Sequence, residues 1–387
     1  MDIFYQLIQT TYISMTVLLI VAMGGLLAER SGVTNIALEG IMVFGAFIGI
    51  WAVAGLENYP YTTFTIIIIF IVLFAFLAII SWGVSRLLKK RFKMNHRFLL
   101  INLAIILILA ILFTFLVSKI QMKTQMVLVM GMMIGGIFGG LYAMIHAYAS
   151  IFMKANQIIS ATALNLFAPA FAIFTARIIE RPIGITGQGG QQIPFKSSFM
   201  IQRIPVLSDI PIIGELFFTR VYFSFYLGIA ILITLYIIIY KTKFGIRLRA
   251  CGENPHAADS LGVNIYRLRF LAVTLSGVFA GLGGVIFVVS TSTEFNVTVA
   301  GFGFLAIAVL IFGNWRPSRI LLAAIFFGFM RTIASSYTII PFLRGLGLPT
   351  ELYNMTPYIA TLVVLAFFSK NSRAPKALGQ IYDQGKR

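Results

Sequence analysis

The stretch Glu29-Arg-Ser-Gly-Val-Thr-Asn-Ile-Ala-Leu-Glu-Gly40 separates two long apolar runs near the start of the chain. A charged side chain in the middle of a membrane span costs about 2.5 to 3.5 kcal/mol on insertion scales, so charges beside spans are candidates for function. Asn35 and Glu39 are four residues apart and share one face if the second helix begins near Thr34. The stretch predicts a polar break between two spans, which either lines a transport path or caps the interface.

The composition around this break is typical of a polytopic membrane protein. Of the 387 residues, 59% are hydrophobic and 11% are charged, and the mean hydropathy is +0.94. Soluble domains contain about a quarter charged residues, which excludes an ordinary water-soluble enzyme. We therefore expect an all-α fold, a polytopic transmembrane helical bundle.

Eleven apolar stretches are candidates for spanning helices, which need roughly 20 residues each. They cover residues 12–28, 36–55, 63–88, 98–118, 126–152, 158–179, 221–240, 268–291, 299–312, 320–340 and 358–368. The ninth and eleventh stretches are short, as expected for helices that are tilted or buried in protein. The sequence therefore predicts about eleven spans, and not fewer than nine.

The net charge of +18, from 30 Lys and Arg against 12 Asp and Glu, indicates the orientation of these spans. The basic residues form short clusters between apolar runs, which favours membrane topology over nucleic-acid binding. Alternation of eleven spans places the clusters at 86–97, 241–269 and 370–387 on one side, the cytoplasmic side by the positive-inside rule. We expect the N-terminus outside, the C-terminus inside, a transmembrane domain over 1–370 and a basic cytoplasmic tail over 371–387.

Two segments are expected to lie outside the membrane. Residues 180–220 contain four prolines and a glycine-rich run, and they predict an irregular extracytoplasmic lobe. Residues 241–267 are charged and predict a cytoplasmic segment with a short helix. Asn254 can cap this helix, Pro255 suits its first position, and Gly262 can end it.

Polar residues and glycines within the spans indicate how the helices meet. Thr162 and Asn165 are three residues apart on one face of the sixth span, where they either bond to a neighbouring helix or line a path. Arg331, late in the tenth span, either marks the outer interface or faces a watery vestibule. Small residues at a spacing of four allow close helix packing, so a packing seam is expected at Gly131, Gly135 and Gly139.

The sequence lacks the motifs of the common catalytic sites. It contains no G-x-x-x-x-G-K-[ST] phosphate loop, no G-x-S-x-G elbow and no H-E-x-x-H pair. One cysteine and three scattered histidines do not have the spacing of a zinc site. We therefore expect no enzymatic activity, no metal and no cofactor in this chain.

Three stretches together carry a resemblance to a known family. The first is 29–40, which is similar to the pattern E-R-[SA]-G-x-x-N-x-x-x-E-G; the second runs from Phe244 through Gly252-Glu-Asn-Pro-His-Ala-Ala258 to Gly262. The third is the glycine-rich run 301–313, followed by Pro317. In this order they resemble the permease subunits of ABC importers in the branched-chain amino acid, ribose and nucleoside group, and the first is most similar to the nucleoside-type permeases.

The resemblance implies a permease with a type II importer-like fold in the bacterial plasma membrane. It implies a second permease subunit, a cytoplasmic ATP-binding-cassette ATPase that binds the ATP, and an extracytoplasmic substrate-binding lipoprotein. The residues expected to couple the chain to the ATPase are Gly252, Glu253, Asn254, Pro255, Ala257 and Ala258. The residues expected along the path of a nucleoside or similar small polar solute are Asn35, Glu39, Thr162 and Asn165.

Other functions remain open at this point. The same group of permeases includes carriers of branched-chain amino acids and pentoses. A self-sufficient secondary transporter is disfavoured by the large charged inner loop and by the scarcity of charges within the spans. An intramembrane enzyme lacks a pair of acids, a histidine or a nucleophile in a suitable arrangement.

Overall fold

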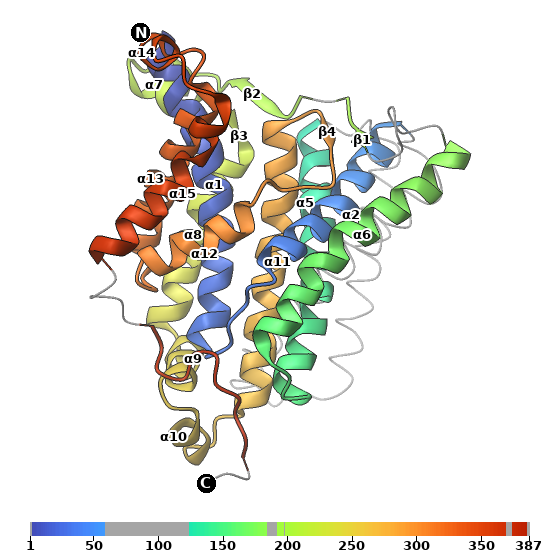
Figure 1. Cartoon of the computed structure of the whole chain (residues 1–387), viewed down its shortest axis with the longest axis vertical. Coiled ribbons are helices and arrows are strands. Elements are labelled where there is room, and N and C mark those ends of the chain that lie inside the picture. The colour runs from blue at the N-terminus through green and yellow to red at the C-terminus, as the bar shows by residue number, and fades with distance from the viewer. Residues whose placement is uncertain (1, 59–123, 184–191, 197, 369–373, 385–387) are drawn as a thin grey trace.

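A computed structural model of the chain describes residues 2–58, 124–183, 192–196, 198–368 and 374–384. The described part is a bundle of long helices, with the N-terminus at one end and the C-terminal segment at the other (Figure 1). The long helices are α1 (Asp2–Arg30), α2 (Leu38–Asn58), α5 (Thr124–Ala147), α6 (Gln157–Ile183), α8 (Phe223–Lys241), α11 (Ile265–Thr291), α13 (Pro317–Ser336) and α15 (Thr350–Phe368). The short ones are the π-helix η1 (Tyr148–Phe152), the 3-10 helix η2 (Leu207–Asp209), α7 (Ile213–Phe217), α9 (Lys243–Glu253), α10 (Pro255–Ser260), α12 (Phe302–Phe312) and α14 (Pro341–Gly345).

The expected all-α membrane bundle is confirmed. Among the described helices, seven are long and apolar enough to cross a membrane: α1, α2, α5 with η1, α6, α8, α11 and α13. The ninth predicted span is indeed short, because α12 has only 11 residues. The eleventh, predicted over 358–368, is the second half of the 19-residue helix α15, which is not among the seven. The predicted spans 63–88 and 98–118 lie outside the described residues, so the total of eleven stays a prediction.

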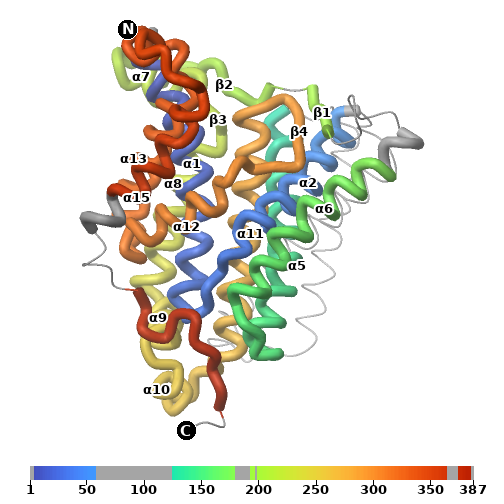
Figure 2. Tube along the Cα trace, in the orientation of Figure 1, coloured from blue at the N-terminus to red at the C-terminus, as the bar shows by residue number. Residues whose placement is uncertain are grey.

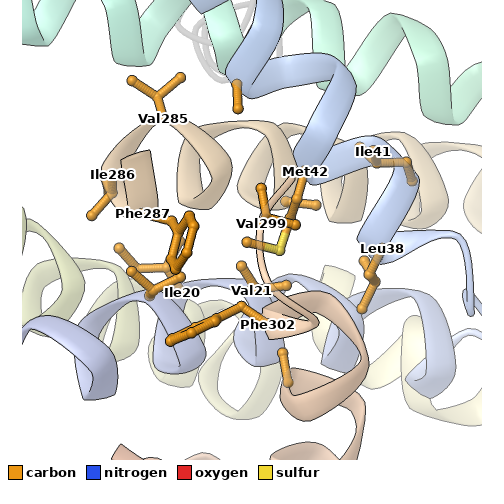
Figure 3. Packing of buried hydrophobic residues seen from close by; sticks show 14 of the residues in the cluster. Ile20, Val21, Leu38, Ile41, Met42, Val285, Ile286, Phe287, Val299 and Phe302 are labelled. Carbon is orange, nitrogen blue, oxygen red and sulfur yellow. The ribbon is translucent and has the colours of Figure 1, made fainter. Parts of the chain in front are cut away.

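The helix α1 lies at the centre of the bundle. Every side chain from Val17 to Met23 is fully buried, since α8, α11, α12 and α13 all pack against α1. A helix that is apolar on all sides is expected to be surrounded by protein in this way. In Figure 3, Ile20 and Val21 of α1 lie beside Phe287 of α11 and Phe302 of α12.

The predicted glycine seam is confirmed, and it joins α5 to both α2 and α11. A Cβ atom added to Gly139 would lie 2.7 Å from the Cα atom of Gly281, and one added to Gly45 would lie 2.8 Å from the carbonyl oxygen of Gly135. No side chain fits at such distances, so the three backbones are in direct contact. We call this contact of α2, α5 and α11 the glycine seam.

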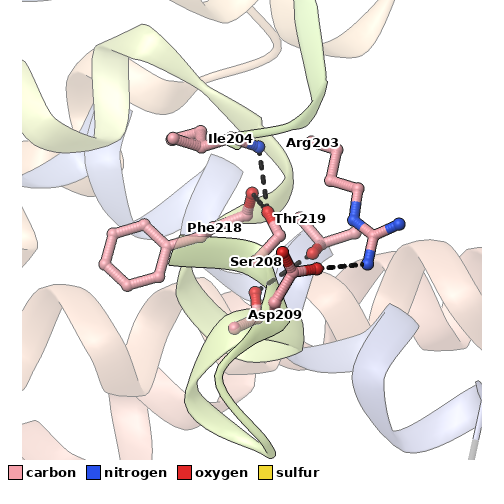
Figure 4. Close-up of polar contacts among 7 residues, drawn as sticks. Arg203, Ile204, Ser208, Asp209, Phe218 and Thr219 are labelled. Atoms are coloured by element: carbon pink, nitrogen blue, oxygen red, sulfur yellow. Dashed lines mark hydrogen bonds and ion pairs between the residues drawn. The ribbon is translucent and has the colours of Figure 1, made fainter. Parts of the chain in front are cut away.

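The segment expected to be an irregular lobe contains regular elements in its described part. The strand β1 (Ile193–Pro194) pairs with β4 (Glu294–Phe295), and β2 (Met200–Arg203) pairs with β3 (Thr219–Tyr222); both pairs are antiparallel. The Ser208 hydroxyl, shown in Figure 4, accepts from Ile204 N at 2.9 Å and donates to Phe218 O at 2.8 Å. This lobe lies at the same end of the bundle as the N-terminus (Figure 2).

Candidate functional site

The polar stretch predicted to separate two helices does so: α1 ends at Arg30 and α2 begins at Leu38. We call residues 31–37 the α1–α2 break. Its backbone is held by side chains from α5 and α6. Gln157 Oε1 accepts a hydrogen bond from Thr34 N at 2.8 Å, and His146 Nε2 lies 3.2 Å from Thr34 O. These bonds satisfy backbone groups that an interrupted helix leaves without partners.

Asn165 of α6 fixes the start of α2. Its Oδ1 accepts from Gly40 N at 2.8 Å, and its Nδ2 donates to Ile36 O at 3.0 Å. The backbones of α2 and α6 are close here, because a Cβ atom added to Gly40 would lie 2.8 Å from the Cα atom of Asn165. One amide side chain therefore supplies both a donor and an acceptor to the broken backbone.

Glu39, in the first turn of α2, binds the start of a second helix. Its Oε1 accepts from Gly301 N at 3.0 Å and its Oε2 accepts from Gly303 N at 2.7 Å, both at the beginning of α12. A helix N-terminus carries partial positive charge and unpaired N–H groups, so a carboxylate is stabilised there. The starts of α2 and α12 consequently meet at one carboxylate.

The other end of α12 is tied to the end of α1. Trp315 follows α12, and its indole Nε1 donates to Glu29 Oε2, while Arg30 Nη2 donates to Trp315 O at 2.7 Å. Glu29 is 4% exposed, so its carboxylate depends on such partners. The glutamates on the two sides of the α1–α2 break thus hold the two ends of α12.

The four residues predicted for the solute path have different environments. Asn35 is 1% exposed, and its Nδ2 donates to Ser276 Oγ of α11 at 3.1 Å. Glu39 and Asn165 are half-buried at the starts of α12 and α2. Thr162 is exposed, and its hydroxyl donates to Ile158 O of its own helix at 2.9 Å. The structure therefore gathers three of the four at the α1–α2 break and leaves Thr162 one turn away on the outer face of α6.

The predicted short helix in the charged segment is confirmed as α10. Asn254 Oδ1 accepts from Ala257 N at 3.1 Å, Pro255 occupies the first helical position, and Gly262 follows the helix with φ +79°. We call α9 and α10 together the α9–α10 segment. It lies at the end of the bundle opposite to the lobe (Figure 1).

The six residues predicted for coupling divide into two sets. Gly252, Pro255 and Ala258 are buried, whereas the other three are exposed: Glu253, Asn254 and Ala257. Leu261, just after α10, is 85% exposed. The buried set fixes the segment to the bundle and the exposed set, with Leu261, faces outward.

The α9–α10 segment contacts Arg30, the last residue of α1, directly before the α1–α2 break. A Cβ atom added to Gly252 would overlap the carbonyl oxygen of Arg30, so only glycine allows this approach. Arg30 Nη1 also lies 4.0 Å from Glu253 Oε1. The segment and the break are thus neighbours, although some 220 residues separate them along the chain.

Several residues of this site are not evident from the sequence. His146 contacts Thr34 and Trp315 contacts Glu29, and each pair is more than a hundred positions apart in the sequence. No local sequence pattern predicts these pairs. Gln157 stands out only as a polar residue at the start of a predicted span. Arg331 is half-buried, with its Cζ atom 5.4 Å from the centre of the Phe302 ring at the start of α12.

Comparisons with known proteins indicate the same family over most of the chain. The family described as branched-chain amino acid transport system, permease component, matches residues 7–126 and 120–365. The nucleoside ABC transporter permease protein NupC of Lactococcus lactis is 39% identical over 62% of this chain and 74% of its own length. The guanosine ABC transporter permease protein NupQ of Bacillus subtilis is 37% identical over 63% and 74%.

A more distant relative covers nearly the whole chain. The putative glucose ABC transporter permease protein TsgC13 of Haloferax volcanii is 26% identical over 98% of this chain and 97% of its own length. No solved structure matches the chain.

Proposed function

Because the chain belongs to the family of branched-chain amino acid transport system permease components, we propose that it forms half of the translocation pathway for a nucleoside or a similar small polar solute. It is a transmembrane permease subunit and a multi-pass plasma-membrane protein. Among the possible solutes the proposal favours nucleosides, because two relatives above 35% identity are named as nucleoside and guanosine permeases.

The observation that carries this proposal is the meeting of two helix starts at Glu39. Discontinuous helices in transporters present backbone ends and polar side chains to a solute near the middle of the membrane. Glu39 and Asn165 offer a carboxylate and an amide at this point, and Asn35 lies in the same break. These groups match the hydroxyls and base edges of a nucleoside, and Thr162 extends the polar surface along α6.

The α9–α10 segment is the proposed contact for a cytoplasmic ATP-binding-cassette ATPase, which binds the ATP. Its exposed residues Glu253, Asn254 and Ala257 lie at the capped N-terminal end of α10. Leu261 adds an exposed apolar side chain just after this helix. In this proposal the chain itself has no enzymatic activity and needs no cofactor, and a second permease subunit completes the pathway.

The lobe at the opposite end is the proposed contact for an extracytoplasmic substrate-binding lipoprotein. Its surface carries several exposed apolar side chains: Val206, Leu207, Ile210, Ile212 and Ile213. Exposed apolar patches of this kind commonly mark interaction sites.

A transport assay with the complete importer tests the solute. The reconstituted complex is expected to take up a radiolabelled nucleoside in preference to branched-chain amino acids, pentoses and glucose. Preferred uptake of one of the other solutes would transfer the proposal to that solute class, and the family description and the glucose relative make these the relevant competitors.

Two substitutions test the proposed path. Asn35→Ala and Asn165→Ala are each expected to lower uptake by about tenfold, a loss of roughly 1.4 kcal/mol, at normal expression of the complex. Normal uptake by both variants would refute the assignment of these residues to the path.

A further inference from the structure

The C-terminal segment 374–384 packs against the α9–α10 segment and does not simply extend from the bundle. Figure 2 shows this segment running beside α9 and α10. Ala377 is 3% exposed and Tyr382 is 5% exposed. A basic tail without a structural role would leave these side chains in solvent.

The first half of the segment forms main-chain hydrogen bonds to α9 and to the α1–α2 break, near the contact of Gly252 with Arg30. Ala377 N donates to Gly252 O at 2.9 Å, at the end of α9, and Gly379 N donates to Gly32 O at 3.1 Å, in the α1–α2 break. Gly379 adopts φ +76°, a conformation that favours glycine. The segment therefore connects α9 to the α1–α2 break through main-chain hydrogen bonds.

Arg269, in the first turns of α11, reinforces this connection. It is 3% exposed; its Nε donates to Ser31 O at 3.1 Å and its Nη1 donates to Gln380 O at 2.9 Å. A buried guanidinium is stable only with such acceptors, and hydrogen bonds from charged donors are the stronger ones. One side chain thus binds the α1–α2 break and the C-terminal segment together.

The second half of the segment covers α10. The Tyr382 ring lies 5.1 Å from that of His256 and 5.4 Å from that of Tyr266, measured between ring centres. It forms a small apolar cluster with Cys251, Ala258 and Ile265. Asp383 adds an ion pair of 2.9 Å with Lys154, which follows η1.

We propose that residues 374–384 are a strap that fixes α10 to the α1–α2 break, with Arg269 as its positioning residue, so that a displacement of α10 moves the break with it. The helix α10 has six residues, too few to be stable or to transmit force without support. One half of the strap, with Tyr382, packs against α10, and the other half, with Ala377 and Gly379, bonds to α9 and the break. The inference rests on the proposed function in one respect, namely that an ATPase moves α10.

A truncation after residue 373 tests the strap in the complete importer. We expect the ATPase to remain bound, while the amount of solute imported per ATP hydrolysed falls at least fivefold, because α10 then moves without the break. Cys251 is the only cysteine of the chain and is fully buried, and burial raises the pKa of its thiol. Its labelling by a water-soluble maleimide, followed on the Cys251 peptide by mass spectrometry, should become at least tenfold faster.

Point variants keep the test decisive if the truncated chain does not fold. Tyr382→Ala should reproduce both effects, whereas Tyr382→Phe keeps the ring contacts and should retain wild-type values for both. Lys376→Gln, at an exposed position of the same segment, is the control and should change neither. An unchanged import ratio or an unchanged labelling rate in both the truncation and Tyr382→Ala would overturn the proposal.

The same measurements distinguish this inference from the proposed function. Absence of solute uptake by the wild-type complex would refute the proposed function, and the labelling of Cys251 in the permease alone would still report on the strap. Normal wild-type uptake with an unaffected import ratio after truncation would refute only the strap.

Discussion

The helix α2 is held in two different ways at two places. In the glycine seam its middle touches α5 and α11 through backbone atoms, with Gly45 against Gly135. At its start it is held by side chains, because Asn165 and Glu39 bond to backbone groups across the α1–α2 break. The seam contains contacts that cannot be exchanged, whereas each hydrogen bond at the break can be replaced by one to a solute or to water.

This difference indicates where the molecule can move. Close-packed interiors tolerate little displacement before contacts are lost, so α2, α5 and α11 are expected to move as one body. The break, by contrast, is held by side-chain hydrogen bonds, and a solute or a water molecule can replace the partner in each of them. A transport cycle would therefore change the geometry at Glu39 and Asn165 and leave the seam intact.

The largest effect is expected in the seam. A Cβ atom on Gly281 would overlap Gly135 O and lie 2.9 Å from the Cα atom of Gly139, so Gly281→Val should destabilise the protein by about 3 kcal/mol. Thermal unfolding of the purified protein in detergent measures this loss. Gly55→Val is the control, since a Cβ atom there meets nothing within 4 Å. Equal melting temperatures of the two variants would contradict the rigid seam.

An intermediate effect is expected at the break. Asn165→Leu leaves Gly40 N and Ile36 O without their partner, which should cost about 2 kcal/mol in thermal unfolding. The control is Thr162→Val on the same helix, because its hydroxyl bonds only to its own helix and its loss should stay within about 0.5 kcal/mol. A larger loss for Thr162→Val would show that α6 contacts α2 differently.

The smallest effect on stability is expected from Glu39→Gln. One amide oxygen can still accept from α12, while the amide nitrogen meets an N–H group, so the expected loss is about 1 kcal/mol. Solute uptake should fall by more than the loss of stability alone would cause, since Glu39→Gln removes the negative charge where the starts of α2 and α12 meet. Glu57→Gln, near the other end of α2, is the control; Glu57 also accepts a backbone hydrogen bond, from Lys196 N at 2.6 Å, and uptake should be unaffected.

Features that depend on neighbouring residues could be predicted from the sequence. The cap at Asn254, the first-turn Pro255 and the terminal Gly262 are all local to α10, and all three are confirmed. The glycine repeat at 131–139 likewise predicted close packing, because spacing alone determines which residues share a face. Its partners on α2 and α11 could not be predicted, since they depend on how distant helices assemble.

The partners of the polar residues follow the same rule. Glu39 could be identified as a cap or a path residue, but not as the cap of α12, which lies more than 260 residues away. Thr162 and Asn165 could be placed near one another on α6, yet the position of α2 decides that only Asn165 bonds to it. The structured part of the tail was missed because its contacts with Arg269 and Gly32 are all distant in sequence.

The two glutamates that hold the ends of α12 also restrict how the sequence can change. Eleven residues of α-helix extend about 16 Å, and this length has to match the separation of Glu29 from Glu39 across the break. An insertion or deletion in α12 or in the α1–α2 break would leave either Glu29 or Glu39 without its end of α12. We expect the lengths of these two segments to be inherited together among the relatives of this permease, even where their side chains differ.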